Sequence, residues 1–292
     1  MKGTNYTLSN METVYYVDGL YPHAAVNDNG DWQAEADPVF EAIQEPRDPH
    51  QTAIAFSGDR LYYPGLIAAL SSVRKFHPQV PLVIIDDGLT VSQVRFLQQY
   101  AEVLKSANPL PEIPAWARFD ISRINYDRVV YLDADVILVS EIPALLETEA
   151  EFAAVRNLDW PIKENFLDAT VLKEYGIDAD TPAFNAGVFS LDNRKWGKSR
   201  LAQEALQLYR RIGHTFAYAD QSALQIIMNS NGSRVTFLDD GYNAIAECWD
   251  WGHHGDSARI VHYAGDEIKP WNPLCQYPML DLFFAHSKIK RC

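Results

Sequence analysis

The feature that most constrains the fold of this chain is an alternation of strand-like and helix-like segments that begins near residue 51. Short apolar runs typical of buried strands stand at residues 52–57 and 80–86. Each is followed by a segment with helical spacing of apolar residues, over 63–78 and 90–100. Parallel strands need such crossover helices, because the chain must return along a face of the sheet before the next strand. The pattern predicts an α/β domain with a parallel or mostly parallel central sheet and helices on both faces.

Local signals mark the ends of these helices and extend the pattern. Pro64 suits a first helical turn, and Thr90 is a typical N-cap. Further strands are predicted over residues 128–133, 152–155 and 184–192. A later helix carries apolar residues at helical spacing, namely Leu201, Ala205, Leu208 and Ile212. Residues 51–275 therefore form one predicted domain with a single Rossmann-like sheet.

The segments on either side of this domain differ from it in composition. Residues 1–50 contain nine acidic and two basic residues, which is half of the chain's net charge of −14. They also contain Tyr15, Tyr16, Tyr21, Trp32 and Phe40, too many aromatic residues for a disordered tail. We expect an N-terminal extension packed beside the sheet. Residues 276–292 form a C-terminal tail.

Bulk properties exclude several classes of protein. A net charge of −14 disfavours nucleic acid as a partner, because phosphate binding requires a basic face. The sequence has no run of 18 apolar residues, and its first ten residues lack a secretory signal. Its three cysteines, Cys248, Cys275 and Cys292, are scattered, which disfavours a disulfide framework or a CxxC metal cluster. We expect a cytoplasmic protein with reduced thiols.

Four acidic residues, Asp59, Asp87, Asp133 and Asp135, come directly after predicted strands. Ligands of parallel sheets bind at the carboxyl ends of the strands, so these side chains should gather at one edge. Clustered carboxylates repel one another unless a cation lies among them. A lone DxD in a loop is usually a solvated turn, but this grouping favours a divalent metal site.

Three further stretches contain candidate binding groups, each with a structural alternative. "FNAGVFSLD" places Asn185, Ala186 and Gly187 at the start of an apolar strand, where small residues let a ligand approach the backbone and the Asn amide can donate to sugar hydroxyls. The alternative is a turn that only initiates the strand. "YADQSALQ" places Asp220 and Gln221 at a helix start, where they also suit a cap.

The third stretch, "IVHYAGDEIKPW", ends a predicted strand. Its imidazole, His262, can complete a metal shell begun by carboxylates, although a single histidine is more often structural. Lys269 offers an ammonium group that can neutralise a diphosphate.

Taken in order, these motifs resemble those of a known family. The series "FSGDRLYYPG", "WARFD", "VVYLDADVIL", "FNAGVFSLDNRKW", "YADQSALQ", "GYN" and "HYAGDEIKPW" is similar to that of family 8 glycosyltransferases of the GT-A fold. That group contains glycogenin and bacterial lipopolysaccharide α-galactosyltransferases and α-glucosyltransferases. The resemblance spans residues 51–275.

The resemblance implies a set of site residues. Asp133, Asp135 and His262 would hold Mn²⁺ or Mg²⁺ against the diphosphate of UDP-glucose or UDP-galactose. Asp59 and Tyr62 would meet the uracil. The implied donor contacts also include Arg118, Asp133, Ala134, Asp135, Asn185, Ala186, Gly265 and Lys269. The implied catalytic residues are Gln221, Asp220 and Lys269.

Two departures from the family pattern stand out. The family's usual ending is HxxGxxKPW, whereas three residues separate Gly265 from Lys269 here. We predict that Lys269 still contacts the diphosphate, because Gly265 permits an altered backbone path. The family also carries an acidic residue shortly after the strand matching 152–155, but here Arg156 and Asn157 come first and Asp159 follows late. That sugar contact is left unassigned.

The resemblance implies a retaining enzyme that transfers a hexose to a hydroxyl acceptor, usually a glycan, by front-side substitution. Two alternatives remain open. "VVYLDADVIL" also resembles a haloacid-dehalogenase phosphatase, with Asp133 as nucleophile, Asp135 as acid/base, and Asp239 and Asp240 as the later acidic pair. A non-catalytic relative that binds sugar nucleotides is the other. The tail offers Lys288, Lys290 and Arg291 for peripheral contact with an anionic membrane, unless it is only a solvated terminus.

Overall fold

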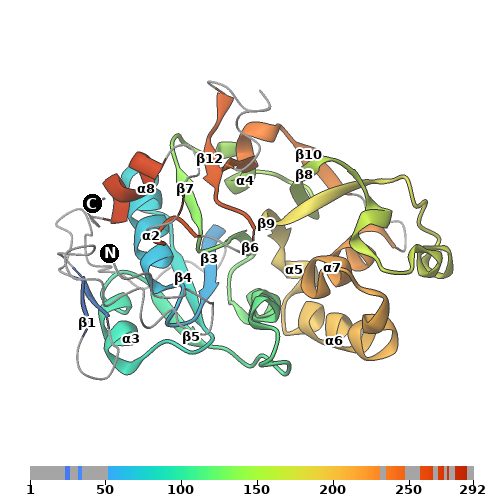
Figure 1. Ribbon diagram of the computed structural model, residues 1–292, viewed down its shortest axis with the longest axis horizontal. Helices are drawn as coiled ribbons and strands as arrows, with labels where there is room; N and C mark the ends of the chain where they lie inside the picture. The colour runs from blue at the N-terminus through green and yellow to red at the C-terminus, as the bar shows by residue number, and fades with distance from the viewer. Residues whose placement is uncertain are drawn as a thin grey trace, which may run out of the picture.

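The structure, a computed structural model, describes residues 24–26, 32–34, 52–230, 235–246, 257–265, 269–272, 275 and 280–287 (Figure 1). Its centre is a seven-stranded sheet in the order β10-β8-β9-β6-β3-β4-β5. In that order the strands are Val235–Leu238, Phe152–Pro161, Pro182–Asp192, Arg128–Leu132, Thr52–Gly58, Leu82–Asp86 and Glu102–Lys105. Neighbouring strands pair in parallel except at β9, which runs antiparallel to both β8 and β6. The prediction of a mostly parallel sheet is confirmed.

Helices cover both faces of this sheet, also as predicted. On β3, Ile54 and Phe56 belong to a hydrophobic cluster shared with α2 (Tyr63–Phe76), α3 (Val91–Leu97) and α8 (Leu280–Ser287). The alternate residues Ala53 and Ala55 face a second cluster shared with α6 (Arg200–Ile212), α7 (Ala219–Asn229) and the 3₁₀ helix η2 (Pro114–Arg123). Successive strand residues point to opposite faces, so a sheet buried on both sides reads as a continuous apolar run.

The predicted helix signals act as expected. Pro64 lies in the first turn of α2. Thr90 caps α3 in a capping box: its hydroxyl accepts from the Gln93 amide at 3.3 Å, and Gln93 Oε1 accepts from the Thr90 amide at 2.9 Å. The buried residues of α6 are Leu201, Ala205, Leu208 and Ile212, the four that the spacing identified.

A second, three-stranded sheet was not anticipated. Its order is β11-β12-β7, with strands Ala244–Ile245, Ile260–His262 and Val136–Leu138. β7 follows β6 directly after the turn that contains Asp133 and Asp135. β12 pairs antiparallel with β7, and His262 lies opposite Val136. This pairing brings a residue from late in the chain beside the two aspartates.

The remaining described elements are short. They are α4 (Pro143–Leu146), α5 (Asn193–Trp196), η3 (Ile162–Asn165), η4 (Ala169–Tyr175), η5 (Gly213–Thr215) and η6 (Asp240–Asn243). Two strands of the N-terminal extension, β1 (Ala24–Val26) and β2 (Trp32–Ala34), pair antiparallel with each other. The rest of the extension, most of the tail including Lys288, Lys290 and Arg291, and Cys248 and Cys292 lie outside the described residues. The expectations for them therefore stay predictions.

Within the described part, every helix is too short or too polar to cross a membrane.

Candidate functional site

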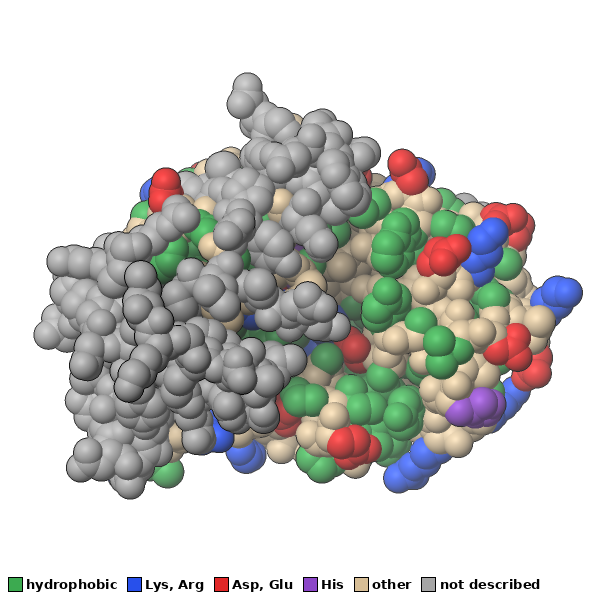
Figure 2. Space-filling view, viewed as in Figure 1, with side chains coloured by type: hydrophobic (Ala, Val, Ile, Leu, Met, Phe, Trp, Pro, Cys, Tyr) green, Lys and Arg blue, Asp and Glu red, His purple; other side chains and the backbone are tan. Residues whose placement is uncertain are grey.

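A pocket of about 610 Å³ opens where β3, β4 and β6 end. Figure 2 shows a hollow near the middle of one face of the molecule, with hydrophobic side chains to its right and below it. Asp59, Asp87, Asp133 and Asp135 all line the pocket. The prediction that these four strand-end carboxylates gather at one edge is confirmed.

The pocket also brings together the other predicted site residues, with one exception. The lining includes Tyr62, Arg118, Ala134, Asn185, Asp220, Gln221, His262, Gly265 and Lys269. Ala186 is absent from the lining and buried. Its amide donates to Gln221 Oε1 at 2.9 Å, and its carbonyl accepts from Arg118 at 2.6 Å. The backbone of Ala186 therefore supports Arg118 and Gln221 from behind the site, and its direct contact with the donor stays a prediction.

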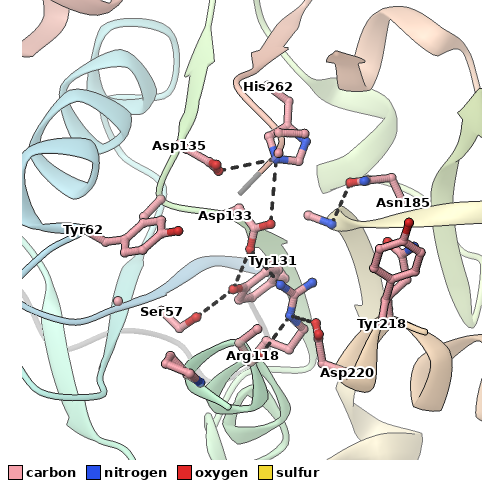
Figure 3. Close-up of a pocket in the computed structure, with 18 of the residues that line it drawn as sticks. Ser57, Tyr62, Arg118, Tyr131, Asp133, Asp135, Asn185, Tyr218, Asp220 and His262 are labelled. Atoms are coloured by element: carbon pink, nitrogen blue, oxygen red, sulfur yellow. Dashed lines mark hydrogen bonds and ion pairs between the residues drawn. The ribbon is translucent and has the colours of Figure 1, made fainter. Parts of the chain in front are cut away.

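Asp133, Asp135 and His262 form a candidate metal centre (Figure 3). One ligand atom from each lies within 4.8 Å of the others. His262 Nε2 is 3.8 Å from Asp133 Oδ2 and 3.4 Å from Asp135 Oδ1. Asp135 Oδ1 is buried and has no hydrogen-bond partner among the residues that the structure describes. A buried carboxylate oxygen is costly to leave unpaired, so these donors fit a divalent cation.

The tautomer of His262 also fits metal binding. Asn243 Nδ2 donates to Asn185 Oδ1 at 3.0 Å, which leaves Asn243 Oδ1 to accept from His262 Nδ1–H at 2.8 Å. Nδ1 is therefore a hydrogen-bond donor, and Nε2 is the ring nitrogen that faces the two carboxylates. Metal-binding histidines are commonly oriented by such a hydrogen bond on the other ring nitrogen.

The two carboxylates have different electrostatic surroundings. Burial raises the pKa of the Asp133 carboxyl, and the Arg118 guanidinium offsets this only in part. Burial acts in the same direction on the pKa of Asp135, but the Lys269 ammonium and the His262 imidazole together outweigh it and hold that pKa well below its usual value. A cation between the two would favour the ionised form of both.

Arg118, on η2, joins the candidate metal centre to the start of α7. Its Nη2 lies 3.2 Å from Asp133 Oδ1, and its Nε lies 2.8 Å from Asp220 Oδ2. Asp220 is not the cap of α7, because Tyr218 occupies the N-cap position without a side-chain hydrogen bond. The carboxylate of Asp220 is instead fixed beside the pocket by the arginine.

Gln221 is held from two sides. Its Oε1 accepts from the Ala186 amide, and its Nε2 donates to Asn165 Oδ1 at 2.7 Å. Asn165 is fully buried on η3. The carboxamide of Gln221 therefore has a fixed orientation at the edge of the pocket, next to Asp220.

Gly187 has a different role from the one its motif suggested. A Cβ at this position would collide with the imidazole of His262 and lie 2.6 Å from Asp133 Oδ2. Glycine is needed here because side chains of the metal centre, and not only a ligand, approach the backbone closely.

Lys269 reaches the metal centre despite the extra residue before it. Its ammonium lies 2.6 Å from Asp135 Oδ2 and also donates to the Gly265 carbonyl. It stands 5.7 Å from the ring centre of Tyr62, which packs edge-on against Trp271 at 5.5 Å. Gly265 has a φ of 102°, a conformation open to glycine but strained for other residues.

Sequence reasoning missed several supporting residues. The Tyr131 hydroxyl donates to Asp133 Oδ1 at 2.9 Å and lies 2.7 Å from Ser57 Oγ. The sequence predicts Tyr131 only as part of an apolar strand. Asn243 stands in the "GYN" motif, which was noted without a role, and Asn165 has no sequence signal. Their contacts exist only because distant segments meet in the fold.

The acidic pair needed by the phosphatase alternative lies elsewhere. Asp239 and Asp240 follow edge strand β10 and are both exposed. Asp239 caps η6 by accepting from the Gly241 amide at 2.9 Å. Neither residue lines the pocket. Asp133 and Asp135 therefore lack the second acidic pair that a phosphatase of this type would place beside them.

Comparisons with known proteins agree with the sequence motifs. Over 199 residues the chain is 28% identical to a lipopolysaccharide 1,2-glucosyltransferase of Escherichia coli K12, an alignment that covers 60% of this chain and 55% of that protein. It is 27% identical over 268 residues to a lipopolysaccharide 1,3-galactosyltransferase of Salmonella typhimurium, covering 79% and 76%. Glycosyltransferase GlyE of Streptococcus pneumoniae is 24% identical over 266 residues, covering 80% and 60%. The chain thus spans little more than half the length of some relatives.

The fold has close counterparts among solved structures. The galactosyltransferase LgtC, crystallised with donor and acceptor sugar analogues, superposes with a TM-score of 0.65 at 19% identity, covering 81% of this chain and 95% of LgtC. The fold is therefore that of the GT-A enzymes. A family model described as glycosyl transferase family 8 matches residues 112–275, more than half of the chain. The chain belongs to glycosyl transferase family 8.

Proposed function

We propose that the protein is a metal-dependent, retaining hexosyltransferase that uses UDP-glucose or UDP-galactose as donor and a glycan hydroxyl as acceptor. The observation that carries this proposal is the meeting of Asp133, Asp135 and His262 at the end of β6, where Asp135 Oδ1 is buried without a hydrogen bond from any described residue. The relatives named as glucosyltransferases and galactosyltransferases support a hexose donor. The pocket volume of about 610 Å³ is adequate for a nucleotide sugar.

Different residues of the pocket would bind the uracil, the diphosphate and the hexose of the donor. Asp59 and Tyr62, at the β3 end of the pocket, would bind the uracil end. Mn²⁺ or Mg²⁺ held by Asp133, Asp135 and His262 would neutralise negative charge on the diphosphate. Asn185 presents an amide Nδ2 that has no partner within the described part of the chain, and it would donate to a hydroxyl of the transferred hexose.

Transfer exchanges one bond for another at the anomeric carbon. The bond from this carbon to the diphosphate oxygen breaks, and its electron pair leaves with UDP. The acceptor oxygen forms the new bond on the same face and gives its proton to the departing phosphate. Positive charge that develops at the carbon is stabilised by oxygens of Asp220 and Gln221, both fixed at the pocket edge.

Lys269 would stabilise the leaving diphosphate. Before donor binding its ammonium is paired with Asp135 and the Gly265 carbonyl. A nucleotide diphosphate offers a second set of anionic oxygens close to that position, and a lysine stem is long enough to reach them. We expect the metal to be Mn²⁺ in preference to Mg²⁺, because an imidazole among the ligands suits the softer ion.

The test is to measure UDP release from UDP-glucose and UDP-galactose without acceptor, with EDTA and with added Mn²⁺. We expect slow release from one donor that depends on Mn²⁺ and is lost in His262→Ala. Release that persists in EDTA would refute the proposal. UDP binding without release, even with acceptors present, would instead favour a non-catalytic relative.

A further inference from the structure

Two hydroxyl groups, those of Tyr131 and Ser57, stand beside the candidate metal centre without a role in the proposed reaction. The Tyr131 hydroxyl is 2.9 Å from Asp133 Oδ1, and Ser57 Oγ is 2.7 Å from the Tyr131 hydroxyl. Figure 3 shows the resulting chain of hydrogen bonds, which runs from Ser57 through Tyr131 to Asp133. Both residues line the pocket.

The register of the sheet explains why these groups meet. Tyr131 of β6 lies opposite Ala55 of β3, in a parallel pair. Side chains two positions apart in a strand share a face, so Ser57 follows Ala55 on that face and Asp133 follows Tyr131. Asp133 continues the line of β6, because its amide donates to the Gly187 carbonyl at 2.8 Å. The ends of two neighbouring strands therefore place a hydroxyl on either side of the Tyr131 oxygen's reach, one from each strand, beside the carboxylate.

The direction of both hydrogen bonds follows from the chemistry of the groups. An ionised carboxylate has no proton to give, so Asp133 accepts and the Tyr131 hydroxyl donates. A phenol has a single proton, so Tyr131 cannot also donate to Ser57. Ser57 must therefore donate its own proton to the Tyr131 oxygen. Two hydrogen bonds aligned in this way polarise and strengthen each other.

The ring that carries the central hydroxyl is held in place. Tyr131 is only 1% exposed, and its ring stacks on that of Phe189 with ring centres 5.2 Å apart. The Arg118 guanidinium lies 5.2 Å from the centre of the Tyr131 ring, within the range of a cation–π contact. A side chain locked by such packing can fix the orientation of a neighbouring functional group.

The two oxygens of Asp133 have different surroundings. Oδ1 accepts from Tyr131 and lies 3.2 Å from Arg118 Nη2. Oδ2 is the oxygen that lies toward His262, 3.8 Å from Nε2. The guanidinium of Arg118 is shared with Asp220, 2.8 Å from its Nε, whereas the Tyr131 proton is given to Asp133 alone. The hydroxyl is therefore the partner that orients this one carboxylate.

We propose that Ser57 and Tyr131 are positioning residues of the candidate metal centre, which hold Asp133 so that Oδ2 faces the cation. This inference rests on the proposed function, since it assigns the cation to a metal-dependent transferase. A carboxylate without a fixed second oxygen can rotate away from a metal ion. Hydrogen bonds behind a metal ligand prevent this, and their loss typically lowers metal affinity about tenfold to a hundredfold.

The test is a double-mutant cycle of Ser57→Ala and Tyr131→Phe. Tyr175→Phe is the matched control, because the Tyr175 hydroxyl on η4 is buried outside the pocket and has no hydrogen-bond partner among the described residues. Ser57→Thr is the conservative variant that keeps the hydroxyl. For each protein one measures the affinity for Mn²⁺ by electron paramagnetic resonance, the affinity for UDP without metal by calorimetry, and UDP release from both donors.

We expect the affinity for Mn²⁺ to fall about tenfold in Tyr131→Phe and about threefold in Ser57→Ala. Because Ser57 acts through Tyr131, the double variant should match Tyr131→Phe within about twofold. Ser57→Thr and Tyr175→Phe should keep the parent affinity. The affinity for UDP without metal should stay at the parent value in all variants, as should the unfolding midpoint of Ser57→Ala within a few degrees.

Two results would overturn the positioning role. One is a Mn²⁺ affinity in Tyr131→Phe that equals that of Tyr175→Phe. The other is a Ser57→Ala variant that loses affinity for UDP without metal but keeps its affinity for Mn²⁺, which would make Ser57 a direct ligand contact. A parent protein that binds Mn²⁺ but releases no UDP would refute the transferase proposal alone, and the Mn²⁺ affinities of the variants would still decide the role of Ser57 and Tyr131.

Discussion

The two sides of the pocket are constructed in contrasting ways. The strand-end wall, with Asp59, Asp133 and Asp135, consists of residues that follow regular parallel strands. The bulge wall consists of residues 157–160 and Tyr218, where β8 leaves its register with the reversed strand β9. Regular strand ends place carboxylates at fixed spacing for a cation and a diphosphate, which are common to all nucleotide-sugar donors. An irregular segment can change without disturbing the sheet, so it suits a partner that differs between relatives.

The largest expected effect is from Asp135→Asn on the strand-end wall. Loss of one charged metal ligand should remove about 4 kcal/mol of transition-state stabilisation, about a thousandfold in turnover. The fold should persist, as judged by circular dichroism. Asp240→Asn is the matched control, because Asp240 is exposed and outside the pocket. Equal activity of Asp135→Asn and Asp240→Asn would show that Asp135 is not needed for turnover and would contradict the role of the strand-end wall.

Lys269→Met should have the next largest effect. It leaves Asp135 buried without its counter-ion, which should lower the free energy of unfolding of the metal-free protein by about 3 kcal/mol. Added Mn²⁺ should restore part of this loss, because it supplies a new positive charge, while UDP release stays about a hundredfold below the parent. Lys173→Met, at an exposed position, controls for loss of charge. Unfolding curves of Lys269→Met that Mn²⁺ does not shift would contradict the shared role of Asp135.

Asn243→Ala tests the support behind His262. Without the hydrogen bond to Nδ1, the imidazole loses its fixed tautomer, so the affinity for Mn²⁺ should fall roughly tenfold to a hundredfold. Mn²⁺ titration followed by electron paramagnetic resonance measures this directly. Asn229→Ala provides a control asparagine, since its side chain bonds only within α7. An unchanged Mn²⁺ affinity in Asn243→Ala would show that the metal does not use His262 Nε2.

The smallest effect is expected for Asn165→Ala, which removes the support behind Gln221 at the edge of the pocket. Gln221 Nε2 loses its acceptor, at a cost of about 1–2 kcal/mol in unfolding free energy. The affinity for UDP should hardly change, whereas the ratio of transfer to hydrolysis should fall several-fold. An Asn165→Ala variant that loses affinity for UDP but keeps the parent ratio of transfer to hydrolysis would contradict the assignment of UDP binding to the strand-end wall.

The same contrast explains how much of the molecule could be predicted from sequence. β3, β4 and β6 are short apolar runs, and α6 has apolar residues at helical spacing, so the positions of these elements and the buried face of α6 followed from the local sequence. The clustering of the strand-end carboxylates could then be predicted, because the carboxyl ends of parallel strands lie at the same edge of the sheet. The series of motifs supplied His262 and Lys269 by resemblance, since neither one has a local signal for metal or phosphate.

The remainder depends on contacts between distant segments. No local sequence signal predicts that β9 runs antiparallel to its neighbours, or that β8 has a bulge at residues 157–160. Both features are fixed by the pairing of strands across the sheet. β12 is only three residues long, yet its pairing with β7 positions His262. The supporting hydrogen bonds of Asn243 and Asn165 depend on these same irregular contacts. The backbone groups of Ala186 bond to Arg118 and Gln221, contacts that its motif position alone does not predict.

The central claim is that residues from two different sheets share one divalent cation with the donor diphosphate. Pulsed electron paramagnetic resonance of Mn²⁺ in the complex with UDP tests it directly, because couplings to directly bound ¹⁴N and to nearby ³¹P are read from the same ion. We predict both couplings in the parent protein, and in His262→Ala the loss of the imidazole ¹⁴N coupling from whatever Mn²⁺ remains bound with UDP. Bound Mn²⁺ that shows ³¹P coupling but no imidazole nitrogen in the parent would contradict the claim.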